Sequence, residues 1–351
     1  MQLSDLSKKI NVNKIYHFKR NKYFSSITSN TKFADKHTIL IVNTNSKIKK
    51  KIILESVQNN IPAIITNRYI NFVNIPQFIV TNLELEVEKL IKNIYKNIPQ
   101  NTVAVTGTNG KTSVVWYVSS ILNLLNYPNS TVGTLGYYKN GKKINDLSLT
   151  TPAYEELFKF GSLSKNINET YIFEASSHAL DQNRIRNYPI KVAAITNISN
   201  DHLDYHKSMS HYKKAKFKLF NKYLLKNGCA VINSRIKHIL KLIELLKSKK
   251  IKIILFGSKN IFFKKKASIL TLFINKNVYK INNLTLNSKI ELENLECAIA
   301  CCLALKIKEK KIVKTLPYIF NPPGRLQKIY YNKKKSNIII DNAHTTEALT
   351  I

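Results

Sequence analysis

The residues best suited to chemistry form one short run, Thr106–Thr112, with the letters TGTNGKT. Its two glycines would let backbone N–H groups turn inward and surround a phosphate. Lys111 would reach the terminal phosphates of a nucleotide, and the Thr112 hydroxyl would hold a magnesium ion. The usual pattern has a glycine five residues before Gly110, where this chain has Val105. The run is therefore predicted to be a variant phosphate-binding loop, and a glycine turn beside a solvated lysine is the less favoured interpretation.

The segments on either side of this run are those that must position it. Thr102–Thr106 (TVAVT) is predicted to be a short buried strand, and Ser113–Leu125 carries apolar residues at helical spacing. A loop between a strand and the N-terminus of a helix presents its N–H groups at the positive end of the helix dipole. This context raises the phosphate-loop interpretation well above a chance match.

Strand and helix patterns continue to alternate after the loop. The strand candidates are Tyr171–Ala175, Val192–Ile198, Cys229–Ile232 and Ile251–Phe256. Between the last two, apolar residues from Ile236 to Leu246 lie on one helical face. Such alternation predicts an α/β fold whose main part is a doubly wound parallel sheet of the P-loop type.

The length of 351 residues allows two or three domains. Residues 1–98, with the short apolar stretches Thr38–Val42 and Pro62–Thr66, are predicted to form a small α/β domain. Residues 99–322 are predicted to form the central ATP-binding domain. Pro322-Pro323-Gly324 then breaks the pattern as a linker, and one more strand, Asn337–Ile340, is expected after it.

Composition excludes several classes of protein. No apolar run approaches the roughly 18 residues that span a bilayer, and the N-terminus lacks the apolar core of a signal peptide. We therefore expect a cytoplasmic protein with no membrane partner. The four cysteines have no metal-ligand spacing, and reduced structural cysteines are favoured over metal or redox roles.

The formal net charge of +35 raises the question of nucleic-acid binding. Only six of the 56 basic residues are arginine, whose planar fork suits bases and phosphates. The lysines form no single stripe along the sequence. A lysine-rich solvated surface is the favoured interpretation, so no specific nucleic-acid partner is expected. Nonspecific polyanion binding in vitro is expected whatever the function.

Taken together with later motifs, the phosphate-loop run resembles the Mur ligase family. TGTNGKT is the form of loop used by Mur ligases and folylpolyglutamate synthases, and the other motifs follow in the family's order. They are Thr134-Leu135-Gly136, Thr150-Thr151-Pro152, Glu174–His178 (EASSH), Asn200–His206 (NDHLDYH), His211–Lys216 (HYKKAK), Pro323-Gly324-Arg325 and Asp341–His344 (DNAH). The resemblance covers roughly residues 25–350. The EASSH, DHLDYH and HYKKAK wording is most similar to the member that acts on UDP-MurNAc-L-Ala-D-Glu.

This resemblance implies an ATP-dependent amide ligase of peptidoglycan precursor synthesis. Such an enzyme activates a carboxylate of UDP-MurNAc-L-Ala-D-Glu as an acyl phosphate and then adds an amino acid, expected here to be meso-diaminopimelate. The implied cofactors are ATP and Mg²⁺. Lys216 matches the family's carbamylated lysine, in which CO₂ converts an ammonium group into an acidic oxygen ligand.

The site residues implied by the resemblance fall into four sets. The catalytic residues are Lys111, Glu174, His202 and Lys216. The metal ligands are Thr112, Glu174, His202 and Lys216 as its carbamate. The ATP-binding residues are Thr106, Gly107, Thr108, Asn109, Gly110, Lys111, Thr112, Asn294, Arg325 and Asp341. The substrate-binding residues are Thr31, Thr150, Thr151, Ser176, Gln182 and Arg184.

The chain departs from the family pattern at both ends. In the N-terminal domain, which should bind UDP, Thr31 replaces the usual serine, and the loop after Val42 lacks the expected glycine and aspartate. Glu291 stands where an asparagine is typical. Residues 323–351 are expected to hold only the linker and first strand of a C-terminal, Rossmann-like ligase domain, so a separate polypeptide supplying that domain is considered.

Two other functions remain open. A non-catalytic nucleotide-binding remnant would explain a missing domain, but the intact Lys111, Glu174 and Lys216 argue against it. A folylpolyglutamate synthase is the enzymatic alternative, and the EASSH and DHLDYH wording disfavours it.

Overall fold

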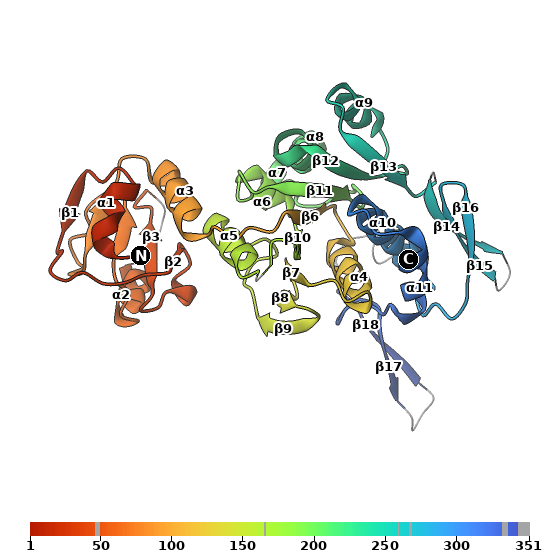
Figure 1. Ribbon diagram of the computed structural model, residues 1–351, viewed down its shortest axis with the longest axis horizontal. Coiled ribbons are helices and arrows are strands. Elements are labelled where there is room, and N and C mark those ends of the chain that lie inside the picture. The colour runs from red at the N-terminus through yellow and green to blue at the C-terminus, as the bar shows by residue number, and fades with distance from the viewer. Residues whose placement is uncertain (46–49, 165, 259, 267–268, 332–335, 343–351) are drawn as a thin grey trace. The chain divides into compact units, whose positions relative to one another are not determined.

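The computed structural model describes residues 1–45, 50–164, 166–258, 260–266, 269–331 and 336–342 (Figure 1). Its contacts divide the chain into two compact units. The N-terminal unit comprises Met1–Ile98 and Ala153–Lys165, and the larger unit comprises Pro99–Pro152 and Asn166–Ile351. Ala343 and His344, the last two residues of the predicted DNAH motif, lie outside the described residues.

The N-terminal unit is built on a five-stranded sheet in the order β1-β5-β4-β3-β2. The strands are β1 (Lys14–Tyr16), β2 (Ser26–Thr28), β3 (Thr38–Val42), β4 (Ile64–Thr66) and β5 (Gln77–Ile79). Strands β2 to β5 are parallel, and β1 pairs antiparallel with β5. All residues of β3 and β4 are buried, as expected for central parallel strands covered on both faces.

Helices and short 3₁₀ turns complete this unit. They are η1 (Leu3–Asp5), α1 (Leu6–Lys9), η2 (Thr31–Phe33), α2 (Lys50–Gln58), α3 (Leu83–Ile94) and α5 (Tyr154–Ser162). Asn82 caps α3 by accepting from Leu85 N, and Glu84 and Glu86 lie in the first turn, where negative charge suits the helix dipole.

Helix α5 buries two adjacent acids, because Glu155 and Glu156 are each only 4% exposed. Burial, together with the neighbouring Glu155, raises the pKa of Glu156 to about 7 against the lowering effect of hydrogen bonds from Ala153 N and the Thr28 hydroxyl. The native unit therefore holds a proton on Glu156 at a pH where the unfolded chain has released it.

This acid makes stability depend on pH in a definite direction. The folded pKa of Glu156 lies above its ordinary value of 4.5, so its contribution to stability is complete below pH 4.5 and is lost as pH rises through about 7. Glu156→Gln should remove this loss, which is at most about 3 kcal/mol. The free energy of unfolding, measured by urea unfolding at about pH 5, 6, 7 and 8, should therefore fall more steeply with rising pH in the wild type than in the variant. Parallel curves would contradict the assignment, and Glu55→Gln, at an exposed site on α2, is the matched control.

The larger unit contains an eight-stranded sheet in the order β13-β12-β11-β6-β10-β7-β8-β9. Its strands are β6 (Asn101–Thr106), β7 (Asn129–Gly133), β8 (Gly136–Lys139), β9 (Lys142–Asn145), β10 (Thr170–Glu174), β11 (Ile190–Ile195), β12 (Leu224–Asn233) and β13 (Lys252–Phe256). The six strands from β13 to β7 are parallel, which confirms the predicted doubly wound sheet. Strands β8 and β9 extend it as an antiparallel hairpin that the sequence did not predict.

Helices α4 (Lys111–Leu124) and α10 (Lys289–Ala304) pack together in the main core of this unit, and both are seen beside the sheet in Figure 1. Val114, Val118 and Ile121 of α4 belong to the same apolar cluster as Ala298 and Cys301 of α10. The remaining helical segments are α6 (Ser177–Asp181), α7 (Leu203–His206), α8 (Met209–Lys218), η3 (Leu219–Tyr223), α9 (Leu240–Ser248), α11 (Glu309–Thr315) and η4 (Leu316–Tyr318). Cys229, Cys297, Cys301 and Cys302 are all free and buried, consistent with the predicted structural role.

Two smaller sheets follow, and one corrects a prediction. Strands β14 (Ile261–Lys266), β15 (Ile269–Ile274) and β16 (Asn277–Ile281) form an antiparallel sheet. The expectation of a single strand after the linker is wrong, because β17 (Gln327–Tyr331) pairs antiparallel with β18 (Ser336–Ile340). The letters QKIYY are typical of a strand in their Ile and Tyr content, and their pairing partner is Ser336–Ile340.

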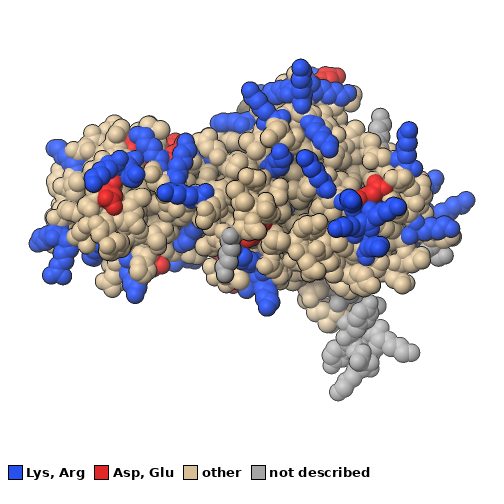
Figure 2. Space-filling model, in the orientation of Figure 1, with Lys and Arg blue, Asp and Glu red and all other residues tan. Residues whose placement is uncertain are grey.

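No helix within the described residues is long and apolar enough to cross a membrane. Figure 2 shows lysine and arginine side chains spread over the face in view, with few acidic side chains among them and no single basic stripe on that face.

Candidate active site in the larger unit

The predicted phosphate loop lies between β6 and α4, as a phosphate-binding loop requires. Gly107 has φ +151° and Gly110, the N-cap of α4, has φ +84°. A Cβ on Gly107 would lie 1.8 Å from Thr196 Oγ1, and one on Gly110 would lie 2.1 Å from Asn294 Oδ1. Both glycines are therefore needed for backbone conformation and for close approach of neighbouring side chains.

The end of β11 holds this loop in shape. The Asn197 side chain accepts from Asn109 N at 2.9 Å and donates to Asn109 O at 3.2 Å. Thr196 Oγ1 donates to Asn109 O at 2.5 Å, and Thr108 N donates to Asn197 O at 3.1 Å. These contacts leave the loop's shape dependent on two residues that lie almost ninety positions further along the chain.

Two lysine amines converge on one carbonyl of the loop. Lys111 Nζ donates to Gly107 O at 2.9 Å and to Thr108 O at 2.7 Å. Lys216 Nζ donates to Gly107 O at 2.7 Å and lies 4.4 Å from the centre of the Tyr212 ring. Lys216 is 1% exposed, although it lies on the lysine-rich helix α8. Burial, and then the charge of Lys111, hold the pKa of Lys216 well below its usual range.

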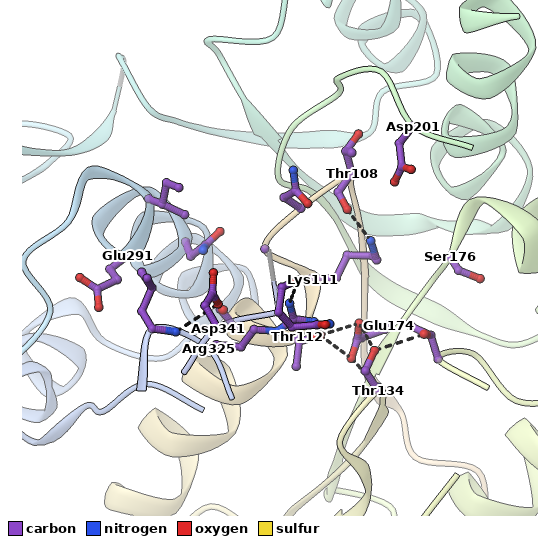
Figure 3. A pocket seen from close by; sticks show the side chains of 18 of the residues that line it. Thr108, Lys111, Thr112, Thr134, Glu174, Ser176, Asp201, Glu291, Arg325 and Asp341 are labelled. Atoms are coloured by element: carbon purple, nitrogen blue, oxygen red, sulfur yellow. Dashed lines mark hydrogen bonds between the residues drawn. The ribbon is translucent and has the colours of Figure 1, made fainter. Parts of the chain in front are cut away.

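Glu174, at the carboxyl end of β10, is the buried acid of this site, with 1% of its surface exposed. Both of its carboxylate oxygens lie 3.0 Å from Thr112 Oγ1, and Oε1 accepts from Thr134 N at 2.7 Å (Figure 3). Burial raises the pKa of Glu174, while the charge of Lys111 and these hydrogen bonds lower it. Hydroxyl and carboxylate oxygens therefore meet beside the phosphate loop.

The placement of Glu174 depends on a glycine in β7, so Gly133→Ala should displace it. A Cβ at Gly133 would lie 2.2 Å from Glu174 Oε1 and 2.8 Å from its Cδ, closer than atoms can approach. Overpacking of this kind costs about 1–3 kcal/mol, and a displaced acid should lower ATP turnover by about a hundredfold. Unfolding curves and ADP release measure the two effects. Shortening the acid in the double variant Gly133→Ala/Glu174→Asp should recover part of the stability, and a fully active single variant would contradict the placement.

One cavity of about 350 Å³ gathers most of the predicted ATP and metal residues. Those that line it are Thr108, Asn109, Gly110, Lys111, Thr112, Glu174, His202, Lys216, Asn294, Arg325 and Asp341. Thr106 and Gly107 do not line it; Thr106 is the last residue of β6, and Gly107 contributes the carbonyl that both lysines share. All of these residues belong to the larger unit.

His202 lies on the rim of this cavity, with 44% of its side chain exposed. It has φ +49°, and its Nε2 lies 3.4 Å from Asp201 Oδ2. Its ring packs against those of His178 and Tyr212, with centroids 4.8 Å and 6.4 Å away. Among the described residues, no group of three or more His, Cys, Asp or Glu side chains is placed to hold a metal ion.

Five of the predicted substrate residues form a connected hydrogen-bond network in the larger unit. Thr150 Oγ1 lies 3.2 Å from Thr134 Oγ1, and Thr151 Oγ1 lies 3.2 Å from Ser176 Oγ. Arg184 donates to Thr151 O at 3.1 Å and to Gln182 Oε1 at 2.8 Å. Only Thr150 and Ser176 of this set line the cavity. The sixth residue, Thr31, belongs to the N-terminal unit.

The residues expected at the adenine, the phosphates and the ribose, Asn294, Arg325 and Asp341, line the same cavity. Asn294 on α10 is 6% exposed, and its side chain approaches Gly110. Arg325 donates to Asn342 O at 3.2 Å, and Asp341 Oδ1 accepts from Leu326 N at 3.2 Å. The chain segment after the linker is thereby tied to the two residues that directly follow β18.

Glu291, which departs from the family pattern, has a local explanation. It occupies the N3 position of α10 and forms a capping box with Ser288, accepting from Ser288 N at 2.6 Å and Asn287 N at 2.9 Å. Its other oxygen accepts from Asn321 Nδ2 at 2.5 Å, and Asn321 Oδ1 accepts from Tyr117 OH at 2.5 Å.

Sequence reasoning missed this network and the roles of Gly133, Thr134 and Asn197. The one local signal available for it was the run Ser288–Glu291 (SKIE), which fits the capping-box pattern of Ser or Thr followed three residues later by Glu.

Comparison with known proteins agrees with this geometry. Residues 105–302 match the model of the Mur ligase middle domain. A relative from Rickettsia montanensis, named UDP-N-acetylmuramoyl-L-alanyl-D-glutamate–2,6-diaminopimelate ligase, is 32% identical over 92% of this chain and 68% of its own length. The chain belongs to the Mur ligase family. Members of this family are ATP-dependent, ADP-forming ligases. A ligase of the same name from Wigglesworthia glossinidia brevipalpis is also 32% identical, over 93% of this chain and 69% of its own length.

Solved structures support the fold. A structure of a UDP-N-acetylmuramoyl-L-alanyl-D-glutamate–2,6-diaminopimelate ligase matches with a TM-score of 0.70 and 23% identity, covering 93% of this chain and 68% of that chain. MurF from Acinetobacter baumannii matches with a TM-score of 0.75 and 19% identity over 99% and 74% of the two chains. At these identities the likeness concerns the Mur ligase fold alone.

Proposed function

We propose that this Mur ligase adds meso-diaminopimelate to UDP-MurNAc-L-Ala-D-Glu, using ATP and forming an acyl phosphate on the glutamyl carboxylate. The relatives at 32% identity carry the name of that reaction. The observation that supports the chemistry is the meeting of Lys111, Glu174 and Lys216 in one cavity at the phosphate loop. A carboxylate is a poor electrophile, and transfer of a phosphoryl group to it requires positioning and positive charge around the moving group.

The residues that we assign to the nucleotide act by position and charge. Loop N–H groups and Lys111 would hold the phosphates, with Asn294 at the adenine, Asp341 at the ribose and Arg325 at the phosphates. Lys111 must exchange its bonds to Gly107 O and Thr108 O for the phosphate oxygens.

The donor set fits magnesium. Thr112 Oγ1 and the Glu174 carboxylate are hard oxygen donors 3.0 Å apart, and magnesium is commonly held by one or two carboxylates together with substrate phosphates. We assign Thr112 and Glu174 as ligands, with His202 at the rim as a further one. Bound there, magnesium would neutralise charge on the phosphates.

We assign Lys216 as a carbamylated residue. The neutral form of an amine attacks CO₂, and burial, followed by the charge of Lys111, lowers the pKa of Lys216 and so favours that form. The described contacts of Nζ include no carboxylate within ion-pair distance. A carbamate at this position would supply an acidic oxygen to magnesium and would also carry a charge opposite to that of Lys111.

The substrate residues would serve the sugar-peptide. Arg184, already oriented by Gln182 and Thr151, suits a bidentate grip on a carboxylate. Thr31 and the loop around it in the N-terminal unit would contact the UDP part. The supply of a C-terminal ligase domain by a separate polypeptide stays a prediction.

The test is an assay of the purified chain with ATP, magnesium and UDP-MurNAc-L-Ala-D-Glu, with and without meso-diaminopimelate. The expected result is ADP release that depends on the UDP substrate, with UDP-MurNAc-tripeptide as the product. ADP and acyl phosphate without tripeptide would support activation but not ligation, and the assay is then repeated with a purified C-terminal ligase domain from a relative. ADP release that responds to a folate and glutamate instead would replace the proposal with a folylpolyglutamate synthase.

A further inference from the structure

The loop Thr28–Lys32 is held by acids from a distant part of the sequence. It follows β2 at that strand's carboxyl end, the edge of a parallel sheet where ligands bind. Glu155 Oε1 accepts from Ser29 N at 2.5 Å. Glu156 Oε1 lies 3.3 Å from the Thr28 hydroxyl. Both acids come from α5, more than 120 residues after the loop, and both belong to the same unit as the loop.

These contacts pass into the backbone of the loop. The Thr28 hydroxyl accepts from Asn30 N at 3.0 Å, and the Asn30 side chain accepts from Lys32 N at 3.1 Å. Asn30 is also the N-cap of the short turn η2, whose first residue is Thr31. A displacement of either carboxylate would therefore change the backbone conformation of the loop and so the orientation of Thr31.

The strand that leads into the loop is fixed from the other side. Tyr95, which ends α3, places its hydroxyl 3.2 Å from Ile27 N and 3.1 Å from Ser26 Oγ. Water cannot substitute readily for these partners, because Ser26, Ile27, Tyr95 and both acids are buried. With the strand fixed, the two acids decide the conformation of the loop from the exposed Ser29 onward.

We infer that Glu155 and Glu156 are positioning residues that shape the Thr28–Lys32 loop for the uridine diphosphate part of the substrate. They act through the loop and do not touch the diphosphate, whose charge would be repelled by a carboxylate. The inference rests on the proposed function, because that function supplies the UDP-linked substrate. It assigns to α5, which directly follows the Thr150-Thr151-Pro152 motif in the chain, a part in recognising the nucleotide as well.

The test measures binding of UDP-MurNAc-L-Ala-D-Glu, of UDP alone and of ATP to the full chain by calorimetry. Glu155→Ala should weaken binding of both uridine ligands by about tenfold, since a hydrogen bond to a charged group is lost. ATP binding should change by less than about twofold, because its predicted residues lie in the larger unit. Glu155→Gln, which keeps an acceptor oxygen opposite Ser29 N, should restore most of the affinity. Glu55→Gln, at an exposed site of the same unit, is the control and should change neither.

The outcomes separate this inference from the proposed function. If the wild type binds ATP but neither uridine ligand, the proposed substrate and this inference both fail. If the wild type binds the uridine ligands and Glu155→Ala binds them equally well, the positioning role alone is overturned. Equal losses for ATP and UDP with a lowered melting temperature would show a merely structural role. Should the alanine variant not fold, Glu155→Asp, which withdraws the oxygens from Ser29, takes its place under the same criteria.

Discussion

Lys216→Ala should lower substrate-dependent ADP release by at least about a hundredfold. Loss of groups that merely support a metal ligand already costs ten- to a hundredfold, and the carbamate assigned here would itself be a ligand. Unfolding curves must accompany the assay, because Lys216 is among the largest fully buried side chains and its truncation leaves a cavity that costs stability.

The carbamate can be observed independently of turnover. Wild-type protein in carbon-13-labelled bicarbonate should give a carbamate signal by NMR, and Lys216→Ala should lack it. Lys214→Ala, an exposed lysine on the same helix, should retain both the signal and full activity. A variant at Lys216 that keeps normal turnover, or a wild type without the signal, would remove the carbamate from the proposal.

Lys111→Ala should lower ATP turnover by about a hundred- to a thousandfold, the usual effect of removing a charge-stabilising donor from a reacting centre. Its amine donates to Gly107 O and Thr108 O beside the loop. In the described part of the chain, Lys216 is the other lysine whose amine donates to Gly107 O. Removal should also raise the pKa of Lys216, since the charge of Lys111 lowers it, and should therefore slow carbamate formation.

The measurements are ADP release and ATP affinity, with Lys142→Ala on exposed β9 as the control. If Lys111→Ala left the function of the protein unchanged, the nucleotide-dependent ligase would be the wrong assignment. Binding to a polyanion would then return as the main alternative. Equal polyanion binding by both variants is expected, because that binding depends on the many surface lysines.

The parallel sheet and its phosphate loop could be predicted from local patterns. Thr102–Thr106 and Ser113–Leu125 bracket the loop in the sequence, and the structure places β6 and α4 within two residues of those limits. Periodicity failed where antiparallel segments were short or interrupted by lysine, as in β9 and β14. It also missed β17, whose strand character depends on pairing with β18.

Within the candidate site, the sequence predicted which residues take part, but it did not predict their burial or their neighbours. The sequence pointed to Lys111, Glu174 and Lys216 through motifs, and all three line one cavity. It could not show that Lys216 is buried, because that helix has charged residues on most sides and little amphipathic pattern. Nor could it show that Gly133 leaves room for Glu174, since the two lie on neighbouring strands 41 positions apart.

The sequence by itself determined the kind of chemistry and the elements that present it, because a phosphate loop and its helix are neighbours along the chain. Only the tertiary structure decided the burial, the pKa shifts and the hydrogen bonds of the candidate site residues. The low pKa of Lys216, the burial of Glu174 and the hold of Glu155 on Ser29 each depend on segments far apart in sequence. Burial and the approach of distant partners set the energy of a charge in a protein, and both arise only when the sheet brings those segments together.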